Sequence, residues 1–274
     1  MFPGAVDIPL SEAAYGIVGA PLERSTTFLP GTRFGPERIR GFARGFEDYD
    51  RQSAQHVTEL AVVDRGDVRP WQDARAYLSF LAGELEDVVR VDAIPLLLGG
   101  EHTVTIAGVE ACGPQTVVCI DAHLDLRESF DDDPYSHATA MHHAREQVEK
   151  VIIIGARAAS KAEWDRAEAD EGITVISPDA ASNQLEWVTE QVSGTPTYLS
   201  LDVDGIDPAY APGTGTREPF GLSPETVRSL IEAIAPTVVG MDVVEVNDRD
   251  DGQTATLAAS LLRRFILNHA NACN

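Results

Sequence analysis

Asp121, His123 and Asp125 are metal-binding residue types that stand at two-residue spacing directly after an apolar run. Because successive side chains of an extended segment alternate between two faces, we expect these three to point the same way. Asp202 and Asp204 repeat the spacing after a second apolar run. Carboxylates with an imidazole suit a hard or borderline divalent ion such as Mn²⁺, and five ligands exceed what one catalytic ion usually takes from protein. The pattern therefore predicts two ions.

Other candidate residues follow further apolar runs. His102 comes after residues 94–98 and two glycines, which we expect to allow a tight turn. Glu245 follows the run that begins at Val238. Taken alone, such a histidine is more often a hydrogen-bonded structural residue, and such a glutamate is usually solvated. His137 begins a predicted helix, where it either carries protons for catalysis or is an ordinary surface histidine.

Apolar runs alternate with helical patterns along the chain, and this alternation predicts an α/β fold. The expected strands are residues 15–20, 60–64, 94–98, 116–120, 151–154, 173–176, 197–201 and 238–241. The expected helices are residues 71–89, 139–148, 161–169, 185–192, 224–233 and 253–271, with a further one beginning at Pro36. We expect three layers, with a mostly parallel sheet between two layers of helices. Ligands bind beyond the carboxyl ends of such strands, where His102, Asp121, Asp202 and Glu245 fall.

The charge of the chain is strongly acidic. It has 44 acidic and 21 basic residues, a formal net charge of -23, and its only lysines are Lys150 and Lys161. Such a field repels nucleic acid and anionic membranes, so we expect neither as a partner. The acidity is explained by cationic ligands or by a solvent shell adapted to multimolar salt. Dispersed acids with so little lysine favour the high-salt explanation.

Length and composition predict a single domain spanning residues 1–274. With 43% hydrophobic residues, the chain can bury a large core. Cys112, Cys119 and Cys273 lack C-x-x-C spacing and are interpreted as reduced thiols. No apolar stretch approaches a membrane span, and the first residues lack a signal pattern. We therefore expect a soluble, cytoplasmic protein.

Two divalent ions predict hydrolytic chemistry. Ions roughly 3.5 to 4 Å apart activate a shared water and direct it at an electrophilic carbon or phosphorus. A phosphoesterase would place cations or backbone amides around the phosphate, whereas this chain offers acids, which favours a cationic or neutral substrate. Glu245 can hydrogen-bond a planar cation in bidentate fashion, because carboxylate and guanidinium geometries match. The run Asp131-Asp132-Asp133 can attract an amine, although a solvated loop is the more ordinary interpretation.

In this order, the motifs resemble the ureohydrolase family of arginases and agmatinases, and look closest to the agmatinases. The resemblance covers nearly the whole chain. Its motifs are Pro30-Gly31-Thr32-Arg33-Phe34-Gly35-Pro36, Gly99-Gly100-Glu101-His102-Thr103, Asp121-Ala122-His123-Leu124-Asp125, Ser200-Leu201-Asp202-Val203-Asp204-Gly205-Ile206-Asp207-Pro208, Ala211-Pro212-Gly213-Thr214-Gly215 and Val243-Val244-Glu245-Val246-Asn247. Each motif alone is moderately specific, and their order is very specific.

The resemblance implies an eight-stranded sheet and two Mn²⁺ ions per subunit. One ion would be held by His102, Asp121, Asp125 and Asp202, and the other by Asp121, His123, Asp202 and Asp204. The family's members commonly assemble as trimers or hexamers, so the resemblance also implies a homo-trimer or homo-hexamer.

The resemblance further implies hydrolysis of agmatine to putrescine and urea, a step of polyamine biosynthesis. Water activated between the ions would attack the guanidinium carbon of this small cationic substrate. Glu245 would anchor the guanidinium group, Asp204 would orient or deprotonate the nucleophile, and His137 would carry a proton to the leaving amine.

Several positions depart from the agmatinase pattern. Arg217 and Phe220 stand where many agmatinases have proline and glycine, Ala138 replaces a common glycine, and Asp248 replaces a common proline. We expect Arg217 and Phe220 around the pocket mouth, where side chains contact the far end of the substrate. The alternatives are another ureohydrolase, namely an aminopropylagmatine ureohydrolase, arginase, guanidinobutyrase or formiminoglutamase, and a non-catalytic metal-binding protein on the same scaffold. The loop from Asp125 looks like that of agmatinases and lacks the Asn- and Ser-rich segment by which arginases hold an α-amino acid.

Overall fold

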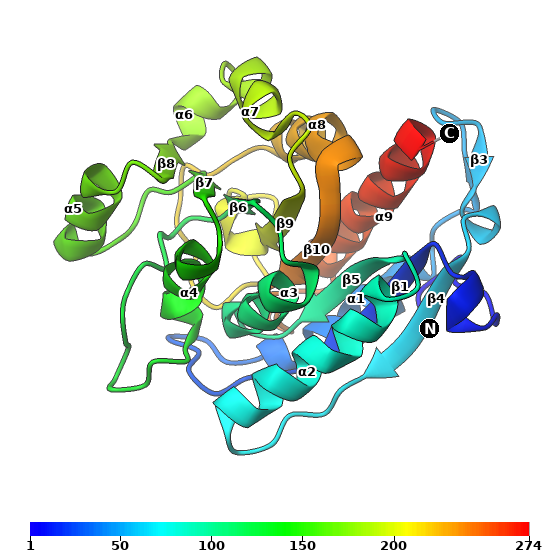
Figure 1. Ribbon diagram of the computed structural model, residues 1–274, viewed down its shortest axis with the longest axis horizontal. Coiled ribbons are helices and arrows are strands. Elements are labelled where there is room, and N and C mark those ends of the chain that lie inside the picture. The colour runs from blue at the N-terminus through cyan, green and yellow to red at the C-terminus, as the bar shows by residue number, and fades with distance from the viewer. Residues whose placement is uncertain (274) are drawn as a thin grey trace.

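Eight segments with buried apolar side chains pair side by side in one sheet at the centre of the molecule (Figure 1). The computed structural model describes residues 1–273. The strands are β1 (Tyr15–Ala20), β4 (Val62–Asp67), β5 (Ile94–Gly99), β6 (Thr116–Ile120), β7 (Lys150–Ile154), β8 (Ile173–Ile176), β9 (Thr197–Asp202) and β10 (Val238–Val244), in the spatial order β4-β1-β5-β10-β9-β6-β7-β8. Every pair of neighbours is parallel. The predicted eight-stranded parallel sheet is confirmed.

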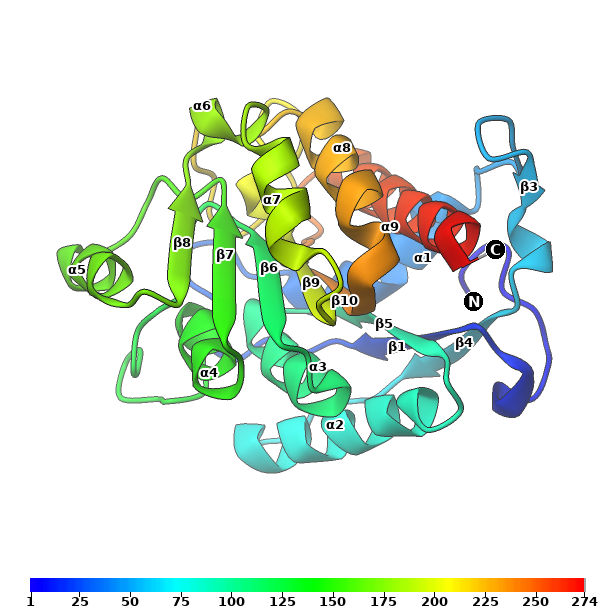
Figure 2. The same ribbon diagram turned by 45° about the horizontal axis from the view of Figure 1, so that its top comes forward.

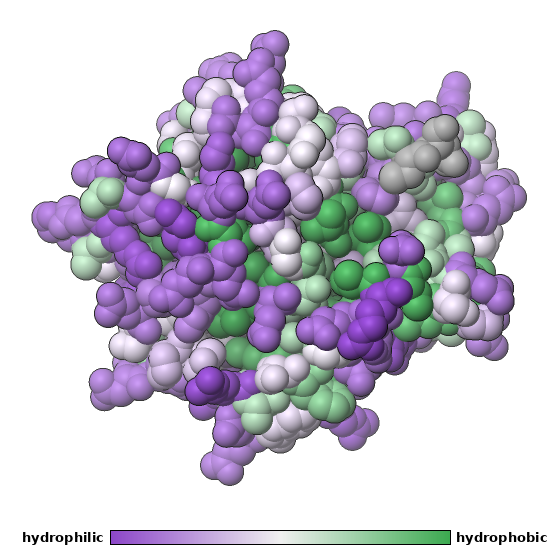
Figure 3. Space-filling view, in the orientation of Figure 1, coloured by the Kyte–Doolittle hydropathy of each residue, from purple (hydrophilic) through white to green (hydrophobic). Residues whose placement is uncertain are grey.

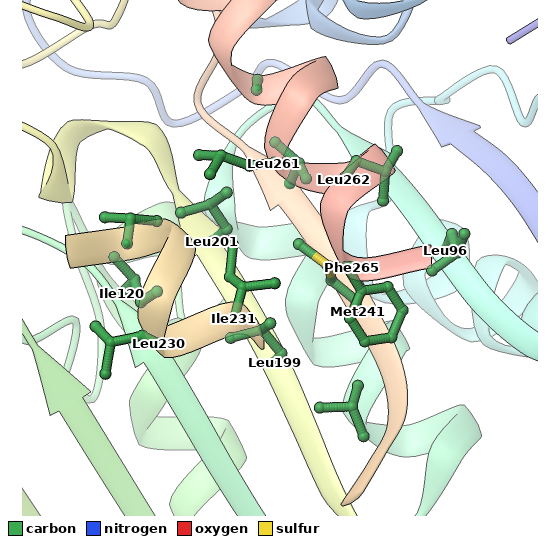
Figure 4. Packing of buried hydrophobic residues seen from close by; sticks show 14 of the residues in the cluster. Leu96, Ile120, Leu199, Leu201, Leu230, Ile231, Met241, Leu261, Leu262 and Phe265 are labelled. Atoms are coloured by element: carbon green, nitrogen blue, oxygen red, sulfur yellow. The ribbon is translucent and has the colours of Figure 1, made fainter. Parts of the chain in front are cut away.

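Helices cover both faces of the sheet (Figure 2). One face is covered by α1 (Gly35–Ala43), α6 (Pro178–Ala181), α7 (Leu185–Val192), α8 (Pro224–Ile234) and α9 (Gln253–Cys273). The other is covered by α2 (Ala74–Val89), α3 (Thr105–Cys112), α4 (Ala140–Gln147) and α5 (Lys161–Ala169). Leu96 and Leu98 of β5 pack towards the first layer and Leu97 towards the second, because side chains alternate along a strand. Figure 4 shows the packing of β6, β9 and β10 against α8 and α9.

Capping residues set the starts of the predicted helices. Ser223 caps α8 by accepting a hydrogen bond from the Thr226 amide, and Pro224 occupies the first turn. The helix expected to start at residue 71 instead starts at Ala74, because the Asp73 side chain accepts a hydrogen bond from the Ala76 amide and caps it there. The boundary prediction was therefore wrong by one turn.

Helix α3 was not predicted from sequence. Nearly all of its residues are buried, so its sequence lacks the apolar stripe that marks a half-exposed helix. The hairpin of β2 (Tyr49–Asp50) and β3 (Gln55–His56) was missed because strands of two residues have no readable alternation.

Gly99, which ends β5, and Gly100, where the chain bends, also permit close packing. A Cβ at Gly100 would lie 2.0 Å from the carbonyl oxygen of Leu22, and one at Gly99 would lie 2.6 Å from Val244 Cγ1. The Gly100 amide donates to the Ala20 carbonyl, and the Gly100 carbonyl accepts from the Glu245 amide, each at 2.8 Å. These contacts fix the chain just before His102.

In residues 1–273, no helix combines the length and apolarity needed to cross a membrane. Cys119 is buried and Cys112 is partly buried, both as free thiols. The side chain of Cys273 lies outside the part of the structure that is described.

Replacement of Gly100 tests the close-packing explanation. Gly100→Ala is expected to lower the free energy of unfolding by about 1–3 kcal/mol, because the added methyl group must displace backbone atoms of Leu22. Gly83→Ala in α2 is the matched control, since a Cβ there meets nothing within 4 Å. It is expected to raise stability by up to about 1 kcal/mol. Urea unfolding followed by circular dichroism measures both, and wild-type stability in Gly100→Ala would contradict the explanation.

Candidate metal centre and substrate pocket

The four central strands bring the predicted ligands to one edge of the sheet. β5, β10, β9 and β6 are consecutive neighbours, and their carboxyl ends lie together because all are parallel. His102 and Glu245 follow β5 and β10, Asp202 ends β9, and Asp121 follows β6. The convergence predicted from the strand ends is present in the structure.

The local backbone of the aspartate motifs is turned, not extended. β6 ends at Ile120, the amide of His123 donates to Asp121 Oδ1 at 2.6 Å, and Asp125 has a φ of +49°. In the other motif, the Asp204 amide donates to Asp202 Oδ1 at 2.8 Å within a short 3₁₀ helix. Simple alternation was therefore the wrong reason for the side chains to meet.

One half of the site is built around His102. Its Nδ1 lies 2.8 Å from Asp125 Oδ2, 3.2 Å from Asp121 Oδ2 and 3.5 Å from Asp202 Oδ2. All four side chains are buried, yet His102 Nδ1 makes no hydrogen bond. A buried nitrogen that faces three carboxylates and has no hydrogen-bond partner is a fitting ligand for a divalent cation.

The other half is built around His123. Its Nδ1 lies 3.1 Å from Asp204 Oδ2 and 3.6 Å from Asp121 Oδ1. Asp121 thus presents one oxygen to each histidine, as a bridging ligand would. Asp204 is held in place by the Ala122 amide at 3.1 Å and by the Thr216 hydroxyl, which donates at 2.9 Å.

The electrostatics of the cluster also fit two cations. Burial, together with the charge of nearby carboxylates, raises the pKa of Asp202 well above its ordinary value, and it raises the pKa of Asp125 as well. For Asp121, burial acts in the same direction, but the two histidines outweigh it and lower the pKa. Buried carboxylates each cost several kcal/mol unless they are compensated, and divalent cations supply that compensation.

Cys119 lies near the site, beside the ring nitrogen of His102 that faces away from the carboxylates. Its Sγ is 3.8 Å from Asp121 Oδ2 and 3.9 Å from His102 Nε2, the ring nitrogen opposite the carboxylate cluster. Burial raises the pKa of the Cys119 thiol, so it remains protonated. We therefore leave Cys119 out of the candidate ligand set.

A cavity of about 180 Å³ opens onto both halves of the site. Glu245, 8% exposed and with a φ of +63°, lines it, and its Oε1 accepts a hydrogen bond from the His102 amide at 2.8 Å. Burial raises the pKa of Glu245 well above its usual range. A positive φ at a buried glutamate marks a strained backbone of the kind that clusters at functional sites.

His137 lines the same cavity. Its Nδ1 lies 3.0 Å from the Ser25 hydroxyl, which donates to the buried carboxylate of Glu101 at 3.0 Å. The ring also packs edge-on against Phe130. The structure thus places His137 in the pocket rather than among surface residues.

The outer wall of the cavity does not include Arg217 or Phe220. Both are exposed, and their place around the pocket mouth stays a prediction. Arg127, Phe130 and Glu163 line the cavity instead, and Arg127 Nε donates to Glu163 Oε2 at 3.1 Å. In the acidic run, Asp131 and Asp132 are exposed and Asp133 pairs with Arg24, as in the solvated-loop interpretation.

Sequence reasoning missed the residues that orient the site. Thr216 directly follows the motif of residues 211–215, and this adjacency was the available signal. Ser25 gave no signal, because its partner His137 is 112 positions away.

Known proteins resemble this chain over most of its length. A model of the arginase family matches residues 13–268. The agmatinase of Bacillus cereus is 34% identical over 269 residues, which cover 93% of this chain and 92% of the relative. The N(1)-aminopropylagmatine ureohydrolase of Thermococcus kodakarensis is 35% identical over 266 residues, or 94% of this chain and 92% of the relative.

A solved structure agrees with the fold and the family. The crystal structure of the agmatine ureohydrolase of Thermoplasma volcanium matches with a TM-score of 0.90 and 32% identity, covering 98% of this chain and 94% of that one. Family model, relatives and structure all point to one group of binuclear metal-dependent enzymes. This protein belongs to the arginase family and is a ureohydrolase, a hydrolase that acts on guanidino compounds.

Proposed function

We propose that this protein hydrolyses agmatine to putrescine and urea with two Mn²⁺ ions bound per subunit. The observation that carries the proposal is one small cavity that contains both halves of the carboxylate-imidazole cluster together with Glu245. Agmatinases among the relatives support the substrate assignment.

The metal ligands in this proposal follow the two halves of the site. His102 Nδ1, Asp121, Asp125 and Asp202 would hold one ion, and His123 Nδ1, Asp121, Asp202 and Asp204 the other. Oxygen ligands with one imidazole per ion suit Mn²⁺. When bound, such ions supply Lewis-acid polarisation and make water a better nucleophile near neutral pH.

Glu245 would bind and orient the guanidinium group. Its carboxylate is buried and lies near the negative charges of Glu101 and Asp204, so a planar cation beside it would offset an otherwise unfavourable charge. A guanidinium held there would present its carbon towards the carboxylate-imidazole cluster in the same cavity. Orientation of this kind supplies a large part of the rate enhancement in hydrolytic enzymes.

His137 would move a proton to the leaving amine. A histidine has the ordinary pKa closest to neutrality and can both accept and donate a proton there. Its Nδ1 faces the Ser25 hydroxyl, and the residue lines the cavity. Asp204, fixed by Thr216 and the Ala122 amide, would orient the attacking water.

Substitution of Asp204 separates a catalyst from a non-catalytic metal-binding protein. Asp204→Asn is expected to reduce urea release at saturating Mn²⁺ by about 10²–10⁴-fold, because a group that acts on the nucleophile is lost. Circular dichroism should show an intact fold. The matched control is Asp179→Asn, which removes the same charge from an exposed position on α6 and should keep wild-type activity. If wild-type protein releases no urea from any guanidino compound, the catalytic proposal fails.

A substrate panel tests the assignment of agmatine. Urea release should be measured from agmatine, arginine, aminopropylagmatine, guanidinobutyrate and formiminoglutamate. We expect kcat/KM for agmatine to exceed that for arginine by at least about tenfold, because the charge of Arg127 on the pocket wall is already met by Glu163 and offers little to an α-carboxylate. If agmatine is not among the better substrates, the specificity proposal is wrong.

We also propose adaptation to high salt. The net charge is -23, and hydrophilic residues cover much of the face shown in Figure 3. Because salt screens the repulsion among like charges, the unfolding temperature and the activity should both rise from dilute buffer to multimolar KCl. The measurement is a KCl series at fixed pH and Mn²⁺, and activity that peaks in dilute buffer would contradict this proposal.

A further inference from the structure

A buried chain of hydrogen bonds lies behind His102, on the side away from the cavity. His102 Nε2 lies 3.0 Å from the Ser200 hydroxyl, and that hydroxyl donates to Asp242 Oδ1 at 2.7 Å. All three side chains are 0% exposed. Ser200 and Asp242 stand opposite each other in the register of β9 and β10, so the sheet itself sets their positions.

The donors and acceptors of this chain fix the position of one proton. An ionised carboxylate only accepts hydrogen bonds, and Asp242 Oδ1 accepts from the Ser200 hydroxyl. The single proton of the Ser200 hydroxyl therefore lies in the hydrogen bond to Asp242. Ser200 can then only accept from His102, so Nε2 must carry a proton.

The tautomer of His102 follows from this. A neutral imidazole with its proton on Nε2 has a bare lone pair on Nδ1. Nδ1 is the atom that faces Asp121, Asp125 and Asp202. The other neighbour of Nε2 is Cys119 Sγ at 3.9 Å. Sulfur is a weak acceptor, so the proton on Nε2 is directed to the Ser200 oxygen instead.

We propose that Asp242, acting through Ser200, is a positioning residue that holds His102 in the tautomer and ring orientation needed to bind one of the two ions. This inference rests on the proposed role of His102 as a metal ligand. A buried carboxylate in a sheet is unfavourable unless it makes strong hydrogen bonds. The orientation of His102 through Ser200 accounts for a carboxylate at this buried position. Neither residue touches the substrate, so both act through the affinity for metal.

Metal titration of the full-length protein tests the proposal. Wild-type and Ser200→Ala proteins, stripped with chelator, are titrated with Mn²⁺ at one pH, and bound ions are followed by calorimetry and by the spin-coupled resonance signal of a two-ion centre. In Ser200→Ala, one of the two ions should bind about 10- to 100-fold more weakly, as for loss of other partners that orient a ligand. The coupled signal should appear only at correspondingly higher Mn²⁺.

Two further variants separate this effect from a loss of folding. Thr197→Val removes another buried hydroxyl from β9, one that donates to the Thr195 carbonyl at 2.9 Å, and should keep wild-type Mn²⁺ affinity. Asp242→Asn keeps the shape of the side chain but removes the anionic acceptor, and should weaken the same ion as Ser200→Ala.

The outcomes distinguish this proposal from the proposed function. Wild-type affinity for both ions in folded Ser200→Ala, or in Asp242→Asn if Ser200→Ala does not fold, would overturn the role of the hydrogen-bond chain. An equal loss of affinity in Thr197→Val would overturn it too. Wild-type protein that binds fewer than two ions would instead refute the two-ion site.

Discussion

Buried negative charge at the ends of four neighbouring strands is the constraint on which the rest of this structure depends. Asp121, Asp125, Asp202 and Asp204 are each at most 6% exposed and lie around two imidazole rings. Arg157 lies close by, but its guanidinium donates to backbone carbonyls, including that of Asp204, rather than to these carboxylates. Besides the two histidines, bound cations would supply the compensating charge in the proposed function. The same negative charge would favour a positively charged guanidino compound in the adjoining pocket.

Much of the fold could be predicted because its local signals agree with its long-range packing. β6 and β9 are continuous apolar runs, as expected of strands covered on both faces, and Ser223-Pro224 marks the start of α8. Helix α3 could not be found in this way, because a helix buried on nearly all sides has no polar face to set its period. The period of a helix can be read from the sequence only where the helix has one buried and one exposed face.

The site was predictable in its residues but not in its geometry. His102, Asp121, Asp202 and Glu245 could be chosen because each follows a predicted strand, and parallel strands end at one edge. The turned backbone at Asp125, the hydroxyl of Ser25 beside His137 and the Ser200-Asp242 pair depend on contacts between distant segments. The pocket wall of Arg127, Phe130 and Glu163 likewise could not be read from local sequence patterns.

The central claim is that two cations share this cluster, with Asp121 between them. Crystals of the full-length protein grown with Mn²⁺, measured on both sides of the manganese absorption edge, test it most directly. Two anomalous peaks should appear, one beside His102 Nδ1 and one beside His123 Nδ1, with an oxygen of Asp121 bound to each. A single peak, or none, in crystals saturated with Mn²⁺ would contradict the account.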